Sequence, residues 1–405
     1  MTAIPEFDGP RPLRRNESAA AHRLFRVCFS NIAADDREPA GGAAEVEETP
    51  SDEPVYESRG ETHTIAAQGR PVSMISIFHE RLHACGGLIR IGSIGGVCTH
   101  PHFRGHGLAT RLLEHCTRRL AEGGAQLLLI SGGRGLYTRA GCTPAGRFAG
   151  FCLRPGEAPP PGRGVVLRPL ETGDALDGSR LYQTGQACFE RSLAQFTSSF
   201  SRPPGGYHAE QWMVEMDGRP AGYLLLTVPW EFVGRPELGV REVFEYAGSS
   251  LALAGGLAAA LHRPGIREVR ANIAWQDFDL IRLLREAGFG PQWSALPDHT
   301  FRIINFPRLM ASLRPYLRAR LEPRLLRGLR FEQRGPLLRS GGEDGLLTIA
   351  RGKDRLTLTA ADMTRLVMGS PDGPDAGSLQ APGAVKDIAA ALFPLPSFLP
   401  GLNYH

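Results

Sequence analysis

Residues 97–110 decide how the rest of this chain is interpreted, and they read Val97-Cys98-Thr99-His100-Pro101-His102-Phe103-Arg104-Gly105-His106-Gly107-Leu108-Ala109-Thr110. The apolar segment that leads into them predicts a buried strand, and Leu108, Leu112 and Leu113 would share one face of a following helix. Glycines in the turn let backbone N–H groups approach an anion, the helix adds the positive end of its dipole, and Arg104 adds a permanent charge. The stretch therefore predicts a phosphate-binding loop between a strand and a helix.

Two well-known phosphate loops do not fit this turn. It lacks the Lys-Ser or Lys-Thr ending of a nucleotide-triphosphate loop, and its glycines do not follow the dinucleotide-binding spacing, which also requires an acidic residue about 20 positions later. A structural glycine turn without a ligand is the remaining alternative. The surrounding order favours a ligand site, because a helix of about four turns is followed by a strand over residues 126–130 and by Leu136-Tyr137-Thr138-Arg139-Ala140-Gly141-Cys142.

Residues 104–109, Arg-Gly-His-Gly-Leu-Ala, resemble the Arg-x-x-Gly-x-Gly/Ala signature of the GCN5-related N-acetyltransferases (GNATs), whose loop holds the pyrophosphate of coenzyme A. Residues 137–142 resemble the family's Tyr-x-x-x-Gly-Phe element, with Cys142 in the usual place of Phe. The resemblance implies acetyl-CoA as cosubstrate and an α/β (α+β) fold of mixed sheets flanked by helices. It also implies cofactor contacts from Val97, Cys98, Thr99, Arg104, Gly105, His106, Gly107, Leu108, Ala109, Thr110, Gly132 and Gly133.

Composition narrows the range of partners. The 405 residues carry a net charge of +4 with both signs mixed along the chain, so no nucleic-acid or membrane partner is expected. The seven cysteines form no Cys-x-x-Cys pair, and the sequence shows neither a signal peptide nor a membrane-spanning run, which predicts a soluble cytoplasmic protein. His100, His102 and His106 could suggest a metal, but no acidic or Cys ligand accompanies them, so no metal is expected.

Three units are predicted along the chain: a catalytic GNAT domain over residues 1–155, a second GNAT-like domain over 163–304 and a C-terminal unit over 305–405. In the first, the pattern predicts a helix at 19–29, a hairpin at 62–67 and 72–78, a third strand at 87–99 and a last strand at 147–153. Residues 33–54, rich in Glu, Asp, Ala and Pro, predict a mobile loop that serves either as a solvated linker or as an attractor of cationic substrates.

The second unit repeats the element order of the first, with a hairpin at 211–216 and 221–228, strands at 241–246 and 268–273, and helices at 251–261 and 277–287. At the position of the phosphate loop it has Tyr246-Ala247-Gly248-Ser249-Ser250-Leu251, without an Arg or a second Gly at the needed spacing. This unit is therefore expected not to bind coenzyme A, and to act either as a scaffold or as a wall of the acceptor pocket.

The C-terminal unit has predicted helices at 308–317, 360–368 and 385–393 and predicted strands at 346–350 and 355–358. Its small α+β pattern resembles a sterol carrier protein module, and the alternative is a plain domain that stabilises a dimer. Together the three units resemble the Eis (enhanced intracellular survival) family of bacterial acetyltransferases. That resemblance implies a homo-oligomer, hexameric in the family, and an acceptor amine such as an aminoglycoside or a lysine side chain.

Acetyl transfer to an amine requires a base for the amine proton, stabilisation of the oxyanion and an acid for the departing thiolate. By resemblance Tyr137 is the acid, and a packed core tyrosine is the alternative. The N–H groups of residues 97–99 would align the pantetheine arm as a strand edge does. The resemblance places the base at the terminal carboxylate, which here belongs to His405, where the relatives end in an aromatic residue. The rival functions are a non-catalytic acyl-CoA-binding or regulatory protein, and an acyltransferase for a metabolite or a protein N-terminus.

Overall fold

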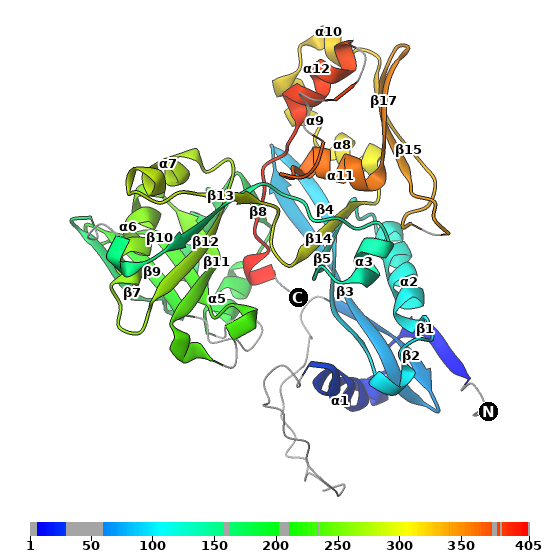
Figure 1. Cartoon of the computed structure of the whole chain (residues 1–405), viewed down its shortest axis with the longest axis horizontal. Helices are drawn as coiled ribbons and strands as arrows, with labels where there is room; N and C mark the ends of the chain where they lie inside the picture. The colour runs from blue at the N-terminus through cyan, green and yellow to red at the C-terminus, as the bar shows by residue number, and fades with distance from the viewer. Residues whose placement is uncertain are drawn as a thin grey trace, which may run out of the picture.

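The computed structural model describes residues 6–29, 60–157, 162–201, 210–232, 235–339, 341–374, 379–380 and 383–403. These residues form two seven-stranded mixed sheets and one three-stranded sheet, with helices packed against them (Figure 1). No helix among them is both long and apolar enough to span a bilayer. The architecture is the expected α/β arrangement of two mixed sheets followed by a small α+β unit.

The first sheet places a parallel pair of strands next to an antiparallel hairpin. Its order is β1 (Phe7–Pro12), β2 (Gly60–Ala67), β3 (Arg70–Ala84), β4 (Gly87–Thr99), β5 (Leu127–Ser131) and β14 (His299–Ile303), with β8 (Ala187–Phe189) paired to β3. The predicted strands at 62–67, 72–78 and 87–99 are confirmed, whereas β1 and β8 were not predicted.

Two helices cover opposite faces of this sheet. Because side chains alternate along a strand, Met74 of β3 packs against α1 (Ser18–Phe29), while Ile75 and Ile77 pack against α2 (Leu108–Glu122). The short helix α3 (Gly135–Arg139) follows β5. The predicted helix at 19–29 and the helix after the glycine loop are confirmed.

The second sheet repeats this plan. Its order is β13 (Gln292–Ser294), β6 (Phe148–Leu153), β12 (Glu268–Ala274), β11 (Val240–Gly248), β10 (Arg219–Thr227), β9 (Glu210–Met216) and β7 (Val165–Pro169). Helices α6 (Ser250–Leu261) and α7 (Phe278–Glu286) share one hydrophobic cluster on one face. Helices α4 (Ala175–Gln183) and α5 (Leu193–Ser201) pack on the other face.

Each large sheet contains strands from the other half of the sequence: β6 in the second sheet, and β8 and β14 in the first. The strand predicted to close the first sheet, at 147–153, is β6, and it pairs with β12 and β13 of the second sheet. Conversely, β14 leaves the second half and pairs antiparallel with β5 of the first. The prediction of a strand is therefore confirmed, but the prediction that this strand belongs to the first sheet was wrong. The apolar composition of β6 predicts a buried strand, but it does not determine which sheet edge the strand joins.

The C-terminal unit contains α8 (Phe306–Ser312), α9 (Arg314–Arg320), α10 (Pro323–Leu326), β15 (Leu329–Arg334), β16 (Leu346–Arg351), β17 (Asp354–Thr359), α11 (Ala360–Met368) and α12 (Gly383–Leu392). The single helix predicted at 308–317 is in fact α8 followed by α9. The break falls at Leu313, because Pro315 lies in the first turn of α9, where its missing N–H group is tolerated. The domain boundaries drawn from the sequence stay a prediction.

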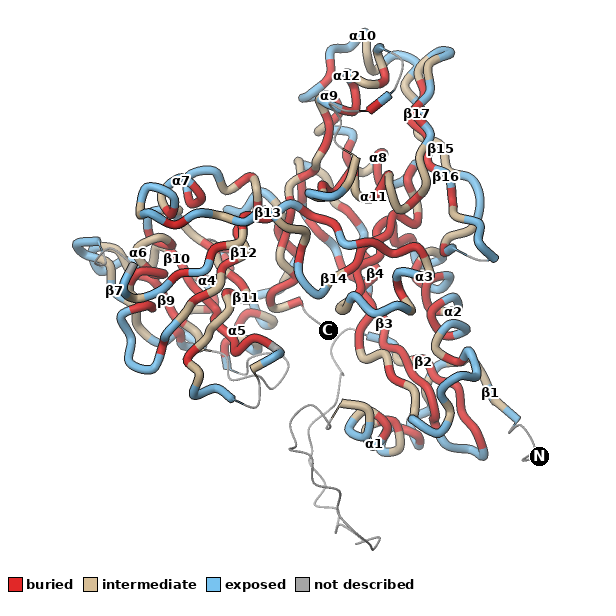
Figure 2. Tube along the Cα trace, in the orientation of Figure 1, coloured by how far each residue is buried: buried red, intermediate tan, exposed pale blue. Residues whose placement is uncertain are grey.

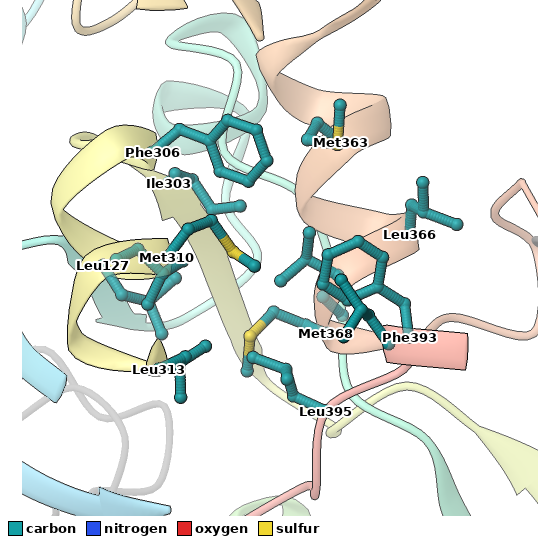
Figure 3. Close-up of a cluster of buried hydrophobic side chains, with 14 of the residues drawn as sticks. Leu127, Ile303, Phe306, Met310, Leu313, Met363, Leu366, Met368, Phe393 and Leu395 are labelled. Atoms are coloured by element: carbon teal, nitrogen blue, oxygen red, sulfur yellow. The ribbon is translucent and has the colours of Figure 1, made fainter. Parts of the chain in front are cut away.

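The C-terminal unit and the first sheet share one hydrophobic core. Leu127 of β5 and Ile303 of β14 lie in the same buried cluster as Met310 of α8 and Met363 of α11 (Figure 3). Burial is concentrated in the strands of the large sheets, and the outward faces of the helices are exposed (Figure 2). A core of this kind holds the first sheet and the C-terminal unit in one relative position.

Candidate active site

The pairing of β4 with β5 ends in the middle of β4. Their parallel register runs from Ile91–Leu127 to Ile94–Ile130, after which β4 continues to Thr99 while β5 ends at Ser131. On the other side of β4, the register of its antiparallel pairing with β3 shifts in the same region, and Gly96 has a φ of +59°. Among the described residues, no strand pairs with the β5-facing edge of residues 95–99. Backbone groups of Val97, Cys98 and Thr99 therefore lie on an edge that an extended ligand arm can use.

The glycine loop leads directly from this edge to the start of α2. Gly105 and Gly107 have φ values of +84° and +70°, and a Cβ atom placed on either would meet no atom within 4 Å. Gly107 is the residue before α2 and has no side chain with which to cap the helix. The first N–H groups of an α-helix, here those of Leu108, Ala109 and Thr110, have no partner within the helix. The loop thus combines open space with backbone donors, which suits a pyrophosphate.

Side chains support the loop from both ends. Leu108 is buried and fixes the start of α2, whereas Arg104, Gly105, His106 and Gly107 are all exposed. The Arg104 guanidinium donates a hydrogen bond from Nε to the Thr99 carbonyl over 3.3 Å. A permanent cation is thereby held at the junction of the strand edge and the loop, where it can contact phosphate oxygens.

Tyr137 lies on α3 beside the end of β5. Its side chain is 3% exposed and belongs to the same buried cluster as Leu108, with Val97 packed against that cluster. A Cβ atom on Gly132 would lie 3.2 Å from the tyrosine ring, so the glycine permits this packing. The structure thus brings the predicted acid, the strand edge and the start of α2 together around one cluster.

The two predicted cofactor contacts at Gly132 and Gly133 have different surroundings. The Gly132 N–H donates to the Asp298 carbonyl over 2.6 Å, and the Gly132 carbonyl accepts a hydrogen bond from the Thr300 hydroxyl. Gly132 therefore holds the exchanged strand β14 in place. Gly133 is exposed, and a Cβ atom there would meet no atom within 4 Å.

A pair of thiols next to the loop was not predicted from the sequence. Cys28 of α1 packs against the cluster that contains Cys98 of β4. A hydrogen bond from Cys98, together with the positive charge of Arg104, lowers the pKa of Cys28 to about 7 against the opposing effect of burial. The same hydrogen bond and burial raise the pKa of Cys98 well above its usual value. A thiol with a lowered pKa therefore lies beside the predicted phosphate-binding arginine.

The C-terminal segment passes between the two large sheets, along a path that the sequence pattern does not specify. Ser397 donates its N–H to Gln276 over 3.0 Å and accepts the Arg147 N–H at its hydroxyl over 2.9 Å. Phe398 makes edge-to-face contacts with Phe189 of β8 and Phe301 of β14, with ring centroids 5.5 and 6.0 Å apart. The segment is thus fixed by elements from both halves of the molecule (Figure 1).

A buried polar network holds the end of this segment. Arg191, in the loop before α5, donates two hydrogen bonds of 2.8 and 2.7 Å to Glu245 of β11 and one of 2.5 Å to the Asn403 side-chain carbonyl. Asn403 in turn donates to Glu80 of β3 over 2.6 Å, and Glu80 accepts the Ser93 hydroxyl over 2.5 Å. The network therefore runs from the second sheet through the tail to β4, one residue before the β4–β5 pairing ends.

Two predicted features lie outside the described residues, namely the terminal His405 and the loop at 33–54. Of the three loop histidines, His100 accepts a hydrogen bond from the His102 backbone N–H, and the His106 ring lies 5.8 Å from the Phe7 ring. Within the described part of the chain, no group of three or more His, Cys, Asp or Glu side chains could hold a metal.

The second sheet lacks an equivalent loop. Helix α6 begins after Ser249, whose hydroxyl accepts the Ala252 N–H over 3.2 Å and so uses one of the free helix donors. Gly248 has a φ of +122°, and a side chain there would collide with the backbone of Ala221 and Gly222. The turn is closed against β10, and it offers neither an arginine nor the open space found at Gly105 and Gly107.

Comparisons with known proteins agree with this geometry. The family model described as acetyltransferase (GNAT) domain matches residues 10–145. No curated protein matches the chain by sequence. Among solved structures, a probable N-acyltransferase from Enterococcus faecalis V583 is 14% identical, with a TM-score of 0.63 over 97% of this chain and 98% of its own.

Two further structures extend over comparable lengths. Eis1 from Mycobacterium abscessus is 13% identical, with a TM-score of 0.60 over 97% of this chain and 98% of its own. A GCN5-related N-acetyltransferase from Anabaena variabilis is 14% identical, with a TM-score of 0.59 over 97% and 100%. Likeness at such low identity establishes the fold. The chain shares the full-length fold of these three proteins, and its residues 10–145 match the family model of the acetyltransferase (GNAT) domain.

Proposed function

We propose that this protein transfers an acetyl group from acetyl-CoA to a primary amine by direct attack within a ternary complex. The observation that carries the proposal is the continuity of two binding elements: the unpaired edge of β4 at residues 97–99 leads through Arg104 into the open loop at Gly105 and Gly107. The edge suits an amide-containing arm and the loop suits a pyrophosphate, and coenzyme A carries both groups in that order.

Tyr137 is proposed as the general acid that protonates the departing thiolate. Support comes from its ring, which packs in the cluster that also contains Leu108, at the start of the helix that we propose for pyrophosphate binding. The transfer itself balances without another reactant: the amine nitrogen forms the C–N bond, the C–S bond breaks, and the thiolate takes a proton.

The terminal carboxylate of His405 is proposed as the base. Support comes from Asn403, which is fixed by Arg191 on one side and Glu80 on the other. Glu80 also binds Ser93, and Ser93 pairs with Leu129 one step before the strands part.

The resemblance to Eis proteins extends the proposal to the whole chain. We assign residues 1–155 to the catalytic domain, 163–304 to a second GNAT-like domain without a cofactor site, and 305–405 to a sterol carrier protein-like domain that stabilises a homo-oligomer. The acceptor would be a small-molecule amine or a lysine side chain. A cytoplasmic location accords with the seven cysteines, all of which are free thiols.

The deciding experiment measures thiol release from acetyl-CoA with a panel of polyamines, aminoglycosides, amino acids and lysine peptides. It compares the native protein with Tyr137→Phe and with a chain that ends at Asn403, which keeps the buried network intact. Turnover on any amine that falls in both variants, while acetyl-CoA still binds, supports the mechanism. Binding of acetyl-CoA without turnover on any amine would instead favour the non-catalytic acyl-CoA-binding alternative.

A further inference from the structure

A groove lies where the first sheet meets the C-terminal unit, away from the glycine loop. It has a volume of about 460 Å³, and its lining comes from the start of β4, from the segment after α2 and from α8. Helix α2 has 15 residues, so at about 1.5 Å per residue it separates the glycine loop from this groove by about 20 Å. The groove is therefore distinct from the proposed acetyl-CoA site.

Two guanidinium groups converge in this groove. A Cβ atom placed on Gly124 would lie 2.8 Å from Nη1 of Arg90 and 3.6 Å from Nη1 of Arg308, so both cations approach the same point. In the part of the chain that the structure describes, neither guanidinium has a hydrogen bond or an ion pair, and no acidic residue lines the groove. Like charges without a counter-ion repel each other, and an anion placed between them would remove that repulsion.

Neighbouring groups do not supply the missing negative charge. Arg81 of β3 lies directly opposite Arg90 in the antiparallel register, but it is itself a cation and is paired with Glu190 over 2.6 Å. Glu122, the last residue of α2, is paired with another arginine of that helix. The last carbonyl groups of α2 accept hydrogen bonds from the N–H groups of residues 123–125. The two guanidiniums therefore keep their donors for a ligand.

The walls of the groove are fixed by Gln126, which is 5% exposed. Its backbone N–H donates to the Arg90 carbonyl over 2.8 Å, and its carbonyl accepts the Asn305 N–H over 3.1 Å. Its side-chain N–H donates to the Ser312 hydroxyl over 2.8 Å, which leaves the hydroxyl proton of Ser312 for another acceptor. One buried amide thus holds β4 and α8 at a fixed separation, and a rigid site loses little conformational entropy when a ligand binds.

We propose that this groove binds a small phosphate-bearing anion, held by the guanidiniums of Arg90 and Arg308 and by the hydroxyl of Ser312. Planar guanidinium groups bind phosphate oxygens through paired, charge-assisted hydrogen bonds. Arg90 belongs to the first sheet and Arg308 to the C-terminal unit, so the bound anion bridges the two. The site is independent of the proposed acetyl transfer, because none of the residues assigned to that reaction lines the groove.

Isothermal titration calorimetry with inorganic phosphate tests the proposal, in a low-salt buffer that limits screening. We expect Arg90→Gln and Arg308→Gln each to weaken phosphate binding roughly 10- to 100-fold, the loss expected when a hydrogen bond to a charged group is removed. Both side chains are exposed, so the variants should fold normally. Arg118→Gln removes an exposed cation of α2 outside the groove and is the matched control, which should bind phosphate as the native protein does.

Ala311→Glu is a second variant, with the opposite sign of charge. Ala311 lines the groove three residues after Arg308 on the same face of α8, so a carboxylate there would take the place of the anion. We expect this variant to lose phosphate binding and to have a higher melting temperature than the native protein in phosphate-free buffer. Native phosphate affinity in Ala311→Glu would contradict the assignment of the groove.

The Arg104→Ala protein separates this groove from the glycine loop, which could also attract free phosphate. Phosphate binding that persists in Arg104→Ala and falls in Arg90→Gln and Arg308→Gln supports the proposal. Binding that is lost only in Arg104→Ala, or no heat of binding up to about 10 mM phosphate, would overturn it. Titration with glycerol 3-phosphate then identifies the source, because tighter binding than that of inorganic phosphate indicates a phosphate ester as the ligand.

Discussion

Arg104 bends back onto Thr99, with its Nε donating to the Thr99 carbonyl over 3.3 Å. The cation of the glycine loop is thus tied to the last residue of β4, and a ligand that follows the strand edge meets it directly. The loop and the strand edge act as one binding surface for a molecule that has both a polar arm and a pyrophosphate.

Replacing this arginine should weaken cofactor binding. We expect Arg104→Ala to raise the dissociation constant for acetyl-CoA roughly 10- to 100-fold, since a hydrogen bond to a charged group contributes about 1.5–3 kcal/mol. Isothermal titration calorimetry measures this change. Arg118→Ala on the exposed side of α2 is the matched control and should bind normally. Equal affinity in Arg104→Ala and Arg118→Ala would contradict the assignment of the loop.

Only one of the two large sheets should take up the cofactor. Calorimetry is expected to give one acetyl-CoA per chain, because the turn at Gly248 is closed against β10 and Ser249 already caps α6. Gly107→Val should abolish the single binding event, since a β-branched residue disfavours the φ of +70° found there. A stoichiometry of two would show that the second sheet has a cofactor site that its backbone does not reveal.

Cys28 should react as a thiolate near neutral pH. Its pKa of about 7 predicts that the rate of alkylation by iodoacetamide rises between pH 6 and 8 with a midpoint near 7, since only the ionised form is a nucleophile. Peptide mass spectrometry separates this site from the other cysteines. In Arg104→Ala the midpoint should move upward, because the guanidinium lowers this pKa. A midpoint above 8 in the native protein would disprove the influence of Cys98 and Arg104.

A buried arginine joins the first sheet to the C-terminal unit. Arg302 of β14 is fully buried and bonds the Asp344 carboxylate over 2.6 Å and the Gly141 carbonyl over 2.9 Å. Arg302→Leu leaves Asp344 without its partner, so we expect the free energy of unfolding to fall by about 3–5 kcal/mol. Urea denaturation measures the loss. Arg282→Ala, which removes an exposed ion pair of α7, should give an unchanged curve.

The local sequence pattern was sufficient to predict the strand, turn and helix that form the proposed binding surface. The strand at 87–99, the turn and the helix after Gly107 follow from a run of apolar residues, a proline and glycines that are all close in sequence. These signals act over a few residues, so a single sequence carries them fully. The placement of Tyr137 beside the end of β5 follows in the same way.

Contacts between segments that are distant in the sequence could not be predicted from local sequence patterns. Glu80 and Asn403 are 323 residues apart, and no periodicity links them. One signal was nevertheless present: Val243, Glu245 and Ala247 share the buried face of β11, and a carboxylate at such a position must have a partner. The pattern identifies the need for a cation and does not identify Arg191 as the residue that meets it.

The exchange of β6 and β14 between the sheets affects folding during synthesis and the folding of truncated fragments. When residue 145 leaves the ribosome, β5 still lacks its outer neighbour, and it keeps a bare edge until residues 299–303 have been synthesised. A gene fragment that encodes residues 10–145 alone would yield a sheet with an open, aggregation-prone side. Because β6 completes the second sheet and β14 completes the first, deleting either half of the chain would leave the sheet of the other half without one of its strands.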